Sequence, residues 1–270
     1  NGEFSGVYAL TEQIDSQFVK YNFQDNTGNL YKEVWPLDFE GKIQTDQSLE
    51  KSLKTNEDED PSFEIIKSFA KQILESKDEI SLKEVIISRM DVDKIISLIV
   101  VDRIIRNDDG PFHWYCDENS FCSNHNYYWY EDPSSKKLYL IPWDLDNAFE
   151  NIIFSTNPVT PIADNFGETT NNCEPFEFGP WNIKQWSASC DKLTKGWSYF
   201  SNELLNTKIN FLNGPFEENR ISNIINEWID QIESSIIEES EIHSDATSYE
   251  KWSGSLDYLI SQLSFVRSSN

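Results

Sequence analysis

The segment DVDKIISLIVVDRIIRN, residues 91–107, constrains the fold more than any other part of the sequence, because it is apolar almost all round. A helix with this composition has no polar face to turn toward water, so other parts of the chain must surround it. With 270 residues, the chain is long enough to build such a core. We therefore expect residues 91–107 to form the central buried helix of a packed globular protein.

Four further segments have the spacing of amphipathic helices: residues 60–76, 193–207, 216–240 and 245–269. In the first of them, Pro61 stands near the start, where a proline is tolerated. In the third, large apolar residues recur every three or four positions, at Ile221, Ile224, Ile225, Trp228, Ile229, Ile232 and Ile236. These patterns predict a mainly helical body after residue 60.

Strand patterns occupy two other regions of the chain. Residues 1–35 predict a strand (FSGVYALTEQI), a helix (DSQFVKYNF) and a second strand (DNTGNLYKEVW). Farther on, NYYWY and KLYLIPW flank a turn built on Asp-Pro-Ser-Ser, which predicts a β-hairpin over residues 125–146 with its aromatic run used for packing. The stretch 155–190 is rich in Pro, Asn and Gly and predicts a long ordered loop. The fold class is therefore α+β, with a small β-rich N-terminal part on a mainly helical lobe.

The charge of the chain excludes some classes of partner. Asp and Glu number 47 against 22 Lys and Arg, a formal net charge of -25. Such a surface repels nucleic acid phosphates and anionic membranes and favours cations or basic proteins. No apolar run approaches the roughly 20 residues that a transmembrane helix needs. We expect neither nucleic acid binding nor a transmembrane segment.

Four cysteines, Cys116, Cys122, Cys173 and Cys190, permit three disulfide pairings. The local pairing, Cys116 with Cys122 and Cys173 with Cys190, closes two short loops in polar, aromatic sequence, as in secreted proteins. The alternative is zinc, because His113, Cys116, Cys122 and His125 have a plausible ligand spacing. We favour disulfides in an oxidising compartment and expect His113 at the surface.

Polar side chains gather at three predicted element ends around the hairpin: Asn107, Asp108 and Asp109 after the buried helix, His125 and Asn126 at the hairpin start, and Asp144 and Asp146 at its finish. A helix end and both ends of a hairpin can converge on one point. Carboxylate and amide oxygens suit Mg²⁺ or Mn²⁺, and phosphoryl transfer uses such a set. Two alternatives stay open: an aspartate at a strand end often caps a turn, and a structural Ca²⁺ site would use the same carboxylates.

Five stretches, NGEFSGVYALTEQID, GNLYK, DVDKIISLIVVDRIIRNDD, HNYYWYEDP and LYLIPWDLDNAF, resemble successive motifs of the spore coat protein H (CotH) kinase family. Members of that family are atypical secreted or surface protein kinases. The resemblance runs in order from residue 1 to about 150 and extends weakly to the end of the chain, where Arg267 matches the arginine of the family's closing helix.

This resemblance implies a divergent protein-kinase-like fold, ATP with Mg²⁺ or Mn²⁺, and Ser/Thr phosphorylation of a protein. It places the catalytic aspartate at Asp109, with Asp108 as the other candidate. It places metal ligands at Asn126 and Asp144, and less firmly at Asp146. Glu12 and Lys32 match small-lobe residues that position phosphates. His125 is expected to orient the loop.

Two departures from the family bear on activity. The loop from Gly110 to Asn124 is longer than usual, and the family's strands before the first motif do not precede Asn1. We expect one CotH-like kinase domain over 1–270, N-terminally incomplete, with 1–45 as a remnant of the small lobe and 60–270 as the helical lobe. The alternative is an inactive structural, coat, fibre or adhesin module. In either case we expect an extracellular, cell-surface or coat location, with a basic, Ser-rich protein substrate for the kinase.

Overall fold

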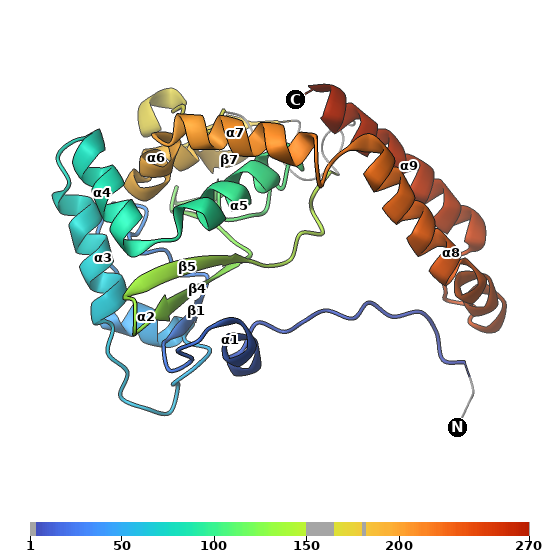
Figure 1. The fold of residues 1–270 in the computed structure, drawn as a ribbon, viewed down its shortest axis with the longest axis horizontal. Helices are drawn as coiled ribbons and strands as arrows, with labels where there is room; N and C mark the ends of the chain where they lie inside the picture. The colour runs from blue at the N-terminus through green and yellow to red at the C-terminus, as the bar shows by residue number, and fades with distance from the viewer. Residues whose placement is uncertain (1–3, 150–164, 180–181, 270) are drawn as a thin grey trace. The chain divides into compact units, whose positions relative to one another are not determined.

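The computed structural model describes residues 4–149, 165–179 and 182–269. The chain divides into two compact units. The first unit is Gln13–Thr207, and the second unit is Asn1–Glu12 together with Lys208–Asn270. The described residues mix helices with small antiparallel sheets, which confirms the α+β class (Figure 1).

The apolar segment after residue 91 forms α5 (Val92–Ile104), a largely buried helix of the first unit. Asp91 begins it by accepting a hydrogen bond from the Lys94 amide at 3.2 Å, as an N-cap does. Residues on several sides of α5 are buried: Ile95, Ile96, Ile99, Val100, Asp102 and Ile104. The prediction of a buried helix is confirmed for most of its surface, although Asp93, Lys94 and Ser97 are exposed on one side.

Three more helices build the first unit around α5: α3 (Glu64–Glu75), α4 (Glu79–Arg89) and α6 (Lys192–Ser198). The sequence did not predict α4, because its apolar residues do not all lie on one face of the helix. Its start is nevertheless encoded locally, since Asp78 and Ser81 form a reciprocal capping box. The predicted helix 193–207 is in fact two helices, α6 and α7 (Ser201–Leu212).

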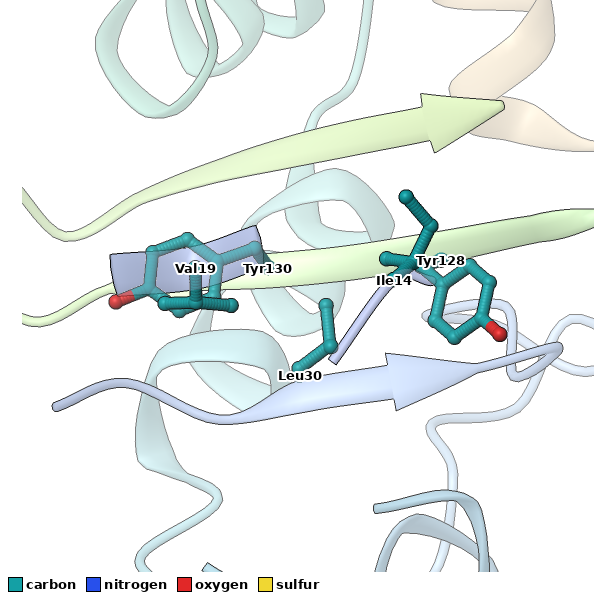
Figure 2. Close-up of a cluster of buried hydrophobic side chains, with 5 residues drawn as sticks. All are labelled: Ile14, Val19, Leu30, Tyr128 and Tyr130. Carbon is teal, nitrogen blue, oxygen red and sulfur yellow. The ribbon is translucent and has the colours of Figure 1, made fainter. Parts of the chain in front are cut away.

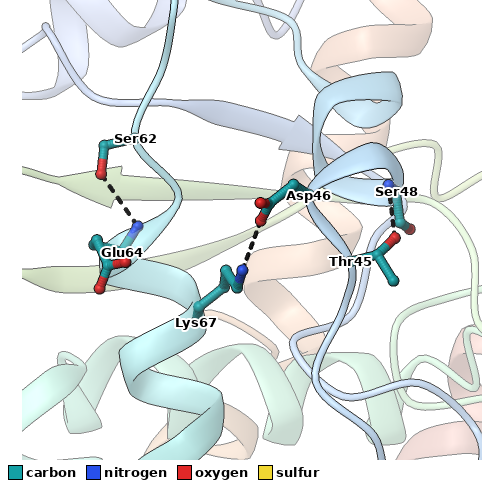
Figure 3. Close-up of polar contacts among 6 residues, drawn as sticks. All are labelled: Thr45, Asp46, Ser48, Ser62, Glu64 and Lys67. Carbon is teal, nitrogen blue, oxygen red and sulfur yellow. Dashed lines mark hydrogen bonds and ion pairs between the residues drawn. The ribbon is translucent and has the colours of Figure 1, made fainter.

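A short helix, α2 (Asp46–Ser52), precedes α3 and is joined to it through side chains. Figure 3 shows Thr45 accepting a hydrogen bond from the Ser48 amide at 3.2 Å, which starts α2. Across the gap, Lys67 Nζ of α3 lies 2.6 Å from the Asp46 carboxylate. At the start of α3, the Glu64 amide donates to the Ser62 hydroxyl at 3.4 Å.

The predicted hairpin forms the core of a three-stranded sheet with the order β1-β4-β5, from β1 (Leu30–Lys32), β4 (Tyr127–Asp132) and β5 (Lys137–Pro142). All pairs are antiparallel. The first five residues of β4 are buried, so the aromatic run packs as expected. Asp132 closes the turn by accepting hydrogen bonds from the Ser134 and Ser135 amides.

Helix α1 (Ser16–Asn22) packs on one face of this sheet. Val19 of α1 and the preceding Ile14 meet Leu30, Tyr128 and Tyr130 from the strands in a buried cluster (Figure 2). Asp15 begins the helix by accepting a hydrogen bond from the Gln17 amide at 2.8 Å. The predicted helix and second strand of residues 1–35 are therefore confirmed.

The first predicted strand is wrong: residues 4–14 form no strand. Tyr8 and Leu10 are exposed, at 75% and 101%. The alternating pattern is present, but a strand also needs a neighbouring strand to satisfy its backbone groups, and this segment has none among the described residues. In the second unit its one long-range hydrogen bond joins the Val7 amide to Glu239 at 3.2 Å.

A second, four-stranded sheet has the order β3-β2-β7-β6. Its strands are β2 (Trp114–Cys116), β3 (Cys122–Ser123), β6 (Phe176–Phe178) and β7 (Ile183–Trp186). The two last strands lie in a region predicted as a long loop, so that prediction is wrong for the described residues 165–190, which also contain the short 3₁₀ turns η1 (Asn171–Cys173) and η2 (Ala188–Cys190). Residues 155–164 of the predicted loop lie outside the described residues.

Both local disulfides form, Cys116–Cys122 and Cys173–Cys190. The zinc alternative is therefore wrong, since its two cysteines are bonded to each other. His113 is also not a surface residue: it is 5% exposed, and its Nε2 lies 2.8 Å from Gln185 Oε1. Burial lowers the pKa of His113 to about 3.

Trp35 joins the two sheets. Its ring meets Trp129 and Tyr127 of β4 at 5.3 Å and Trp114 of β2 at 5.9 Å, all edge to face. It also meets Trp197 of α6 at 5.9 Å. Aromatic pairs of this geometry add stabilisation beyond the area they bury. The first unit thus has one aromatic centre shared by both sheets.

The second unit contains α8 (Glu218–Ile242), α9 (Tyr249–Ser269) and the end of α7. Both long helices match their predicted segments. Arg267 donates a hydrogen bond to the Leu212 carbonyl at 3.1 Å and so ties α9 to the end of α7. None of the helices that the structure describes combines the length and apolar character of a membrane-spanning segment.

Candidate active site

Buried hydrogen bonds between Asn107 and Asp102 anchor the loop after α5. Asn107 is 1% exposed; its side-chain amide donates to Asp102 Oδ1 at 2.9 Å, and its backbone amide donates to the Asp102 carbonyl at 3.1 Å. Burial raises the pKa of Asp102 to about 7. A Cβ on Gly110 would lie 2.3 Å from the Asn107 amide nitrogen, so only glycine fits there. These contacts fix the path of the backbone on both sides of Asp109.

Asp109 is the half-buried carboxylate at the centre of the site. Its carbonyl oxygen and its Oδ2 both accept hydrogen bonds from the Asn126 side-chain amide, at 3.0 and 2.9 Å. Asn147 donates a third hydrogen bond to Oδ2 at 3.3 Å. Burial raises the pKa of Asp109, and the charge of Asp146 raises it further. The nearby His125 and the hydrogen bonds from Asn147 and Asn126 oppose this shift. The carboxylate is therefore oriented by two amides and is more basic than an ordinary aspartate.

Asn126 is held by its backbone as well as its side chain. Its amide donates to Glu33 Oε1 at 3.1 Å, and its carbonyl accepts from the Trp143 amide at 2.9 Å. Its φ of 58° is left-handed, which asparagine tolerates better than most residues. Because the side-chain nitrogen is used on Asp109, Oδ1 is the atom left for a ligand, and no hydrogen bond from the described residues reaches it.

Asp144 lies next to this point, one residue after the Trp143 amide that contacts Asn126. It is exposed, and its φ of 52° turns the chain sharply out of β5. Its carboxylate has no hydrogen bond or ion pair within the described part of the chain. A turn-capping aspartate would accept hydrogen bonds from nearby backbone amides, so the capping alternative has no support here.

Several residues around the site have left-handed backbone, as do others elsewhere in the described chain: Glu33, Arg106, Asn126, Asp144 and Phe149 all have φ between 52° and 70°. Such conformations cost free energy outside glycine, and they gather at functional sites where the surrounding structure enforces them. Here Asn126 precedes the hairpin, Asp144 and Phe149 follow it, Arg106 follows α5 and Glu33 follows β1.

The remaining predicted residues are less closely assembled. Asp108 is fully buried, whereas Asp109 is partly accessible, so Asp109 is the better placed of the two candidates. Lys32 ends β1 with its Nζ 5.9 Å from the centre of the Tyr128 ring, and it makes no ion pair with a described carboxylate. Glu12 is exposed and belongs to the second unit.

Two contributors were missed by reasoning from the sequence: Asn147, which bonds Asp109, and Glu33, which holds Asn126. Each is the sequence neighbour of a predicted site residue: Asn147 directly follows Asp146, and Glu33 directly follows Lys32. The sequence carried no signal that would have chosen them, because their roles depend on which element ends meet in space.

No group of three or more His, Cys, Asp or Glu side chains in the described ranges is arranged to hold a metal ion. The donors available are of mixed type: the amide oxygen of Asn126 and the carboxylates of Asp144 and Asp146. Hard oxygen donors of this kind fit Mg²⁺ or Mn²⁺, which keep several waters and are completed by substrate phosphates. The residues present therefore fit a metal held jointly with a nucleotide.

A family model described as CotH kinase protein matches residues 1–267, nearly the whole chain. This chain belongs to the CotH kinase family. A comparison with curated proteins finds no match. Membership in the CotH family implies a phosphotransferase that needs ATP and a metal and acts on a protein. The family resemblance inferred from the five sequence motifs is confirmed.

Proposed function

We propose that this CotH family member is a secreted or surface Ser/Thr protein kinase with a divergent kinase-like fold. The observation that carries the proposal is the arrangement of Asp109 and Asn126. The same amide group orients the carboxylate that would act as base and leaves its own oxygen facing the position of a metal. Phosphoryl transfer needs these two functions side by side.

Asp109 would orient the substrate hydroxyl and accept its proton. The amides of Asn126 and Asn147 fix the direction of the carboxylate, and partial burial makes it a better proton acceptor. Asp108 cannot reach a substrate without a change in the loop, because it is fully buried. His125, close enough to influence the pKa of Asp109, would help to hold that carboxylate ionised.

Asn126, Asp144 and Asp146 would hold Mg²⁺ or Mn²⁺ against the phosphates of ATP. When bound, the metal would neutralise charge on the transferring phosphoryl group. Lys32 is the candidate for positioning the nucleotide phosphates, and the same role for Glu12, which belongs to the second unit, stays a prediction. The net charge of -25 favours a basic protein substrate, with serine or threonine as the acceptor. Two disulfides fit an extracellular or coat location.

A second candidate function is a catalytically inactive structural, coat or adhesin module. The observation that favours it is the position of Lys32, whose ammonium group lies over an aromatic ring and pairs with none of the described carboxylates. A phosphate-binding lysine in active kinases is normally held by an acidic partner. On this alternative the chain would keep the geometry of Asp109 without binding ATP.

The test is transfer of labelled phosphate from ATP, with Mn²⁺, to a Ser-containing basic protein. Asp109→Asn keeps the hydrogen-bonded shape but removes the base, so transfer should fall by about a hundredfold to ten-thousandfold. Asp58→Asn, at an exposed loop position, is the matched control and should transfer like the wild type. If the wild type transfers nothing, the kinase proposal fails; if Asp109→Asn is undiminished, the assignment of the base fails.

The pH dependence of the same reaction gives a second check. The raised pKa of Asp109 means that the carboxylate becomes protonated, and transfer declines, at a higher pH than for an ordinary aspartate near pH 3.8. Added salt should weaken the preference for a basic substrate, because exposed charges are screened. An activity toward that substrate that does not change with salt would argue against recognition by charge.

A further inference from the structure

Strand β5 has an open edge. It is the last strand in the order β1-β4-β5, so within residues 4–149, 165–179 and 182–269 only one of its two edges faces another strand. Figure 1 shows β5 at the margin of the sheet, on the side toward α5. An open edge presents backbone donors and acceptors that can pair with another extended chain.

The hydrogen-bond pattern identifies which groups of β5 are open. On the β1 side of β4, the Glu131 amide donates to Asn29 and the Glu33 amide donates to Tyr127, so odd-numbered residues of β4 bond toward β1. Alternation then directs even-numbered residues of β4 toward β5, where Tyr128 faces Ile141 and Tyr130 faces Tyr139. On β5, the outward groups therefore belong to the even-numbered residues Leu138, Leu140 and Pro142.

Two observations agree with this assignment. Pro142 has no amide hydrogen, and a proline in a sheet is tolerated where its nitrogen faces away from the neighbouring strand. Leu138 already uses the outer edge, in a parallel bridge with Met90 at the end of α4. The amide and carbonyl of Leu140 and the carbonyl of Pro142 are the groups that continue this edge beyond the bridge.

A groove of about 210 Å³ runs along the same edge. Residues Leu138 to Pro142 line one wall, Phe18, Asn22 and Phe23 of the α1 region line a second, and Met90, Asp91, Lys94 and Ile95 at the start of α5 line the third. Tyr139 and Ile141 pack on the α1 side of the sheet, and Leu138 points to the other face, because side chains alternate along a strand. An added strand would thus insert between two apolar walls.

The size and chemistry of the groove favour a peptide. Small-molecule sites commonly measure about 300–1,000 Å³, so this groove is smaller than a typical nucleotide site, and its apolar walls suit the side chains of a peptide that lies along the β5 edge. Its polar groups are few, and one of them, Lys94, lies over the Tyr139 ring at 5.3 Å. The surrounding chain carries a net charge of -25, which attracts basic residues beside the apolar ones.

We propose that the β5 edge docks an extended segment of a partner protein as a fourth strand of the sheet. The segment would carry apolar side chains on both faces where it lies between the α1 and α5 walls, and basic residues on either side of that apolar stretch. Main-chain hydrogen bonds to Leu140 and Pro142 would supply the pairing, and the walls from α1 and α5 would select the side chains. The site is separate from Asp109 and does not depend on phosphoryl transfer.

Hydrogen exchange on the wild-type protein tests the edge directly. In the free protein the Leu140 amide should exchange faster than the Tyr139 and Ile141 amides, which bond to β4. A short peptide with a central run of valines and lysines at both ends, added in excess, should slow exchange at Leu140 and leave Tyr139 and Ile141 unchanged. If Leu140 is as protected as its neighbours in the free protein, or unaffected by the peptide, the proposal is overturned.

Binding of the same peptide, labelled with fluorescein, tests the mode of recognition. N-methylation of the peptide amides on one edge should weaken binding about tenfold or more, while methylation on the other edge should have little effect. Equal binding of both methylated peptides would mean charge attraction alone and would overturn the proposal. The Leu140→Pro variant should bind the unmethylated peptide about as weakly as the wild type binds the peptide that is methylated on the pairing edge. Asp109→Asn should bind the peptide like the wild type even if phosphate transfer fails.

Discussion

The two sheets of the first unit are held together by different means. The three-stranded sheet contains a six-residue hairpin strand whose first five residues are buried, and it has no disulfide. The four-stranded sheet has strands of two to four residues, and one disulfide joins β2 directly to β3. Burial supports the first sheet, whereas covalent links compensate for the short strands of the second.

This difference bears on the candidate site, because β2 and β3 lie in the chain between Asp109 and Asn126. The segment between these residues folds as part of the second sheet. The partners of Asp109 are therefore held from one side by the packed hairpin and from the other by the disulfide-linked sheet. Trp35 contacts both sheets, so they should not unfold independently.

The largest expected effect is from removing that shared contact. Trp35→Ala should lower the free energy of unfolding by about 3–5 kcal/mol, because it leaves a large cavity among four aromatic rings. Guanidinium denaturation should still show one transition for the wild-type first unit. Trp228→Ala, at a position that is 61% exposed in α8, should change stability by no more than about 0.5 kcal/mol. Similar losses in both variants would show that Trp35 does not join the sheets.

The next largest effect should come from removing the disulfides, which should destabilise the four-stranded sheet more than the three-stranded sheet. Cys173→Ser with Cys190→Ser opens a loop of sequence separation 17 and should cost about 3 kcal/mol, and the Cys116/Cys122 pair, with separation 6, about 2 kcal/mol. Amide exchange should rise in β2, β3, β6 and β7 before it rises in β4 and β5. Equal acceleration in both sheets would contradict the idea that only one of them depends on cross-links.

The pH should act on the two sheets in opposite directions. In β4, burial raises the pKa of Glu131 from 4.5 to about 7, so its contribution to stability is complete below pH 4.5 and is lost as pH rises through about 7. Before β2, burial lowers the pKa of His113 from 6.5 to about 3, so stability is lost as pH falls from 6.5 toward 3. Each group can give a slope of at most about 1.4 kcal/mol per pH unit.

Denaturation curves measured across this pH range check both signs. Glu131→Gln should flatten the loss between about pH 4.5 and 7, and His113→Gln should flatten the loss below pH 6.5. If Glu131→Gln instead flattened the loss on the acid side and His113→Gln flattened the loss between about pH 4.5 and 7, the assigned burial would be contradicted. Asp58→Asn serves as the exposed control.

The smallest expected effect lies outside both sheets. The ion pair between Lys67 and Asp46 joins α2 to α3, with side chains that are 36% and 69% exposed. Lys67→Ala should therefore cost less than about 1 kcal/mol, and high salt should remove most of the difference. A larger, salt-independent loss would mean that α2 contributes more to the core than its exposure suggests.

Much of the fold could be predicted because some segments carry their structure in their own pattern. Helix α5 is apolar over most of its surface, and the hairpin has two apolar runs around an Asp-Pro-Ser-Ser turn. Helix α4 and the strands β6 and β7 could not be predicted in the same way. The residues of all three are polar or mixed, so α4 shows no clear apolar face, and β6 and β7 become regular because neighbouring strands satisfy their backbone groups.

The site was predictable in part for a related reason. Asp109, Asn126 and Asp144 stand at element ends, and the motifs around them indicate the CotH family, so the sequence by itself determined the residue types and their order. Only the tertiary structure decided that one amide of Asn126 holds Asp109, that Asn147 and Glu33 assist, and that Lys32 lies over Tyr128. Those contacts join positions far apart in the chain, and no local pattern records which of many polar side chains will meet once the core closes.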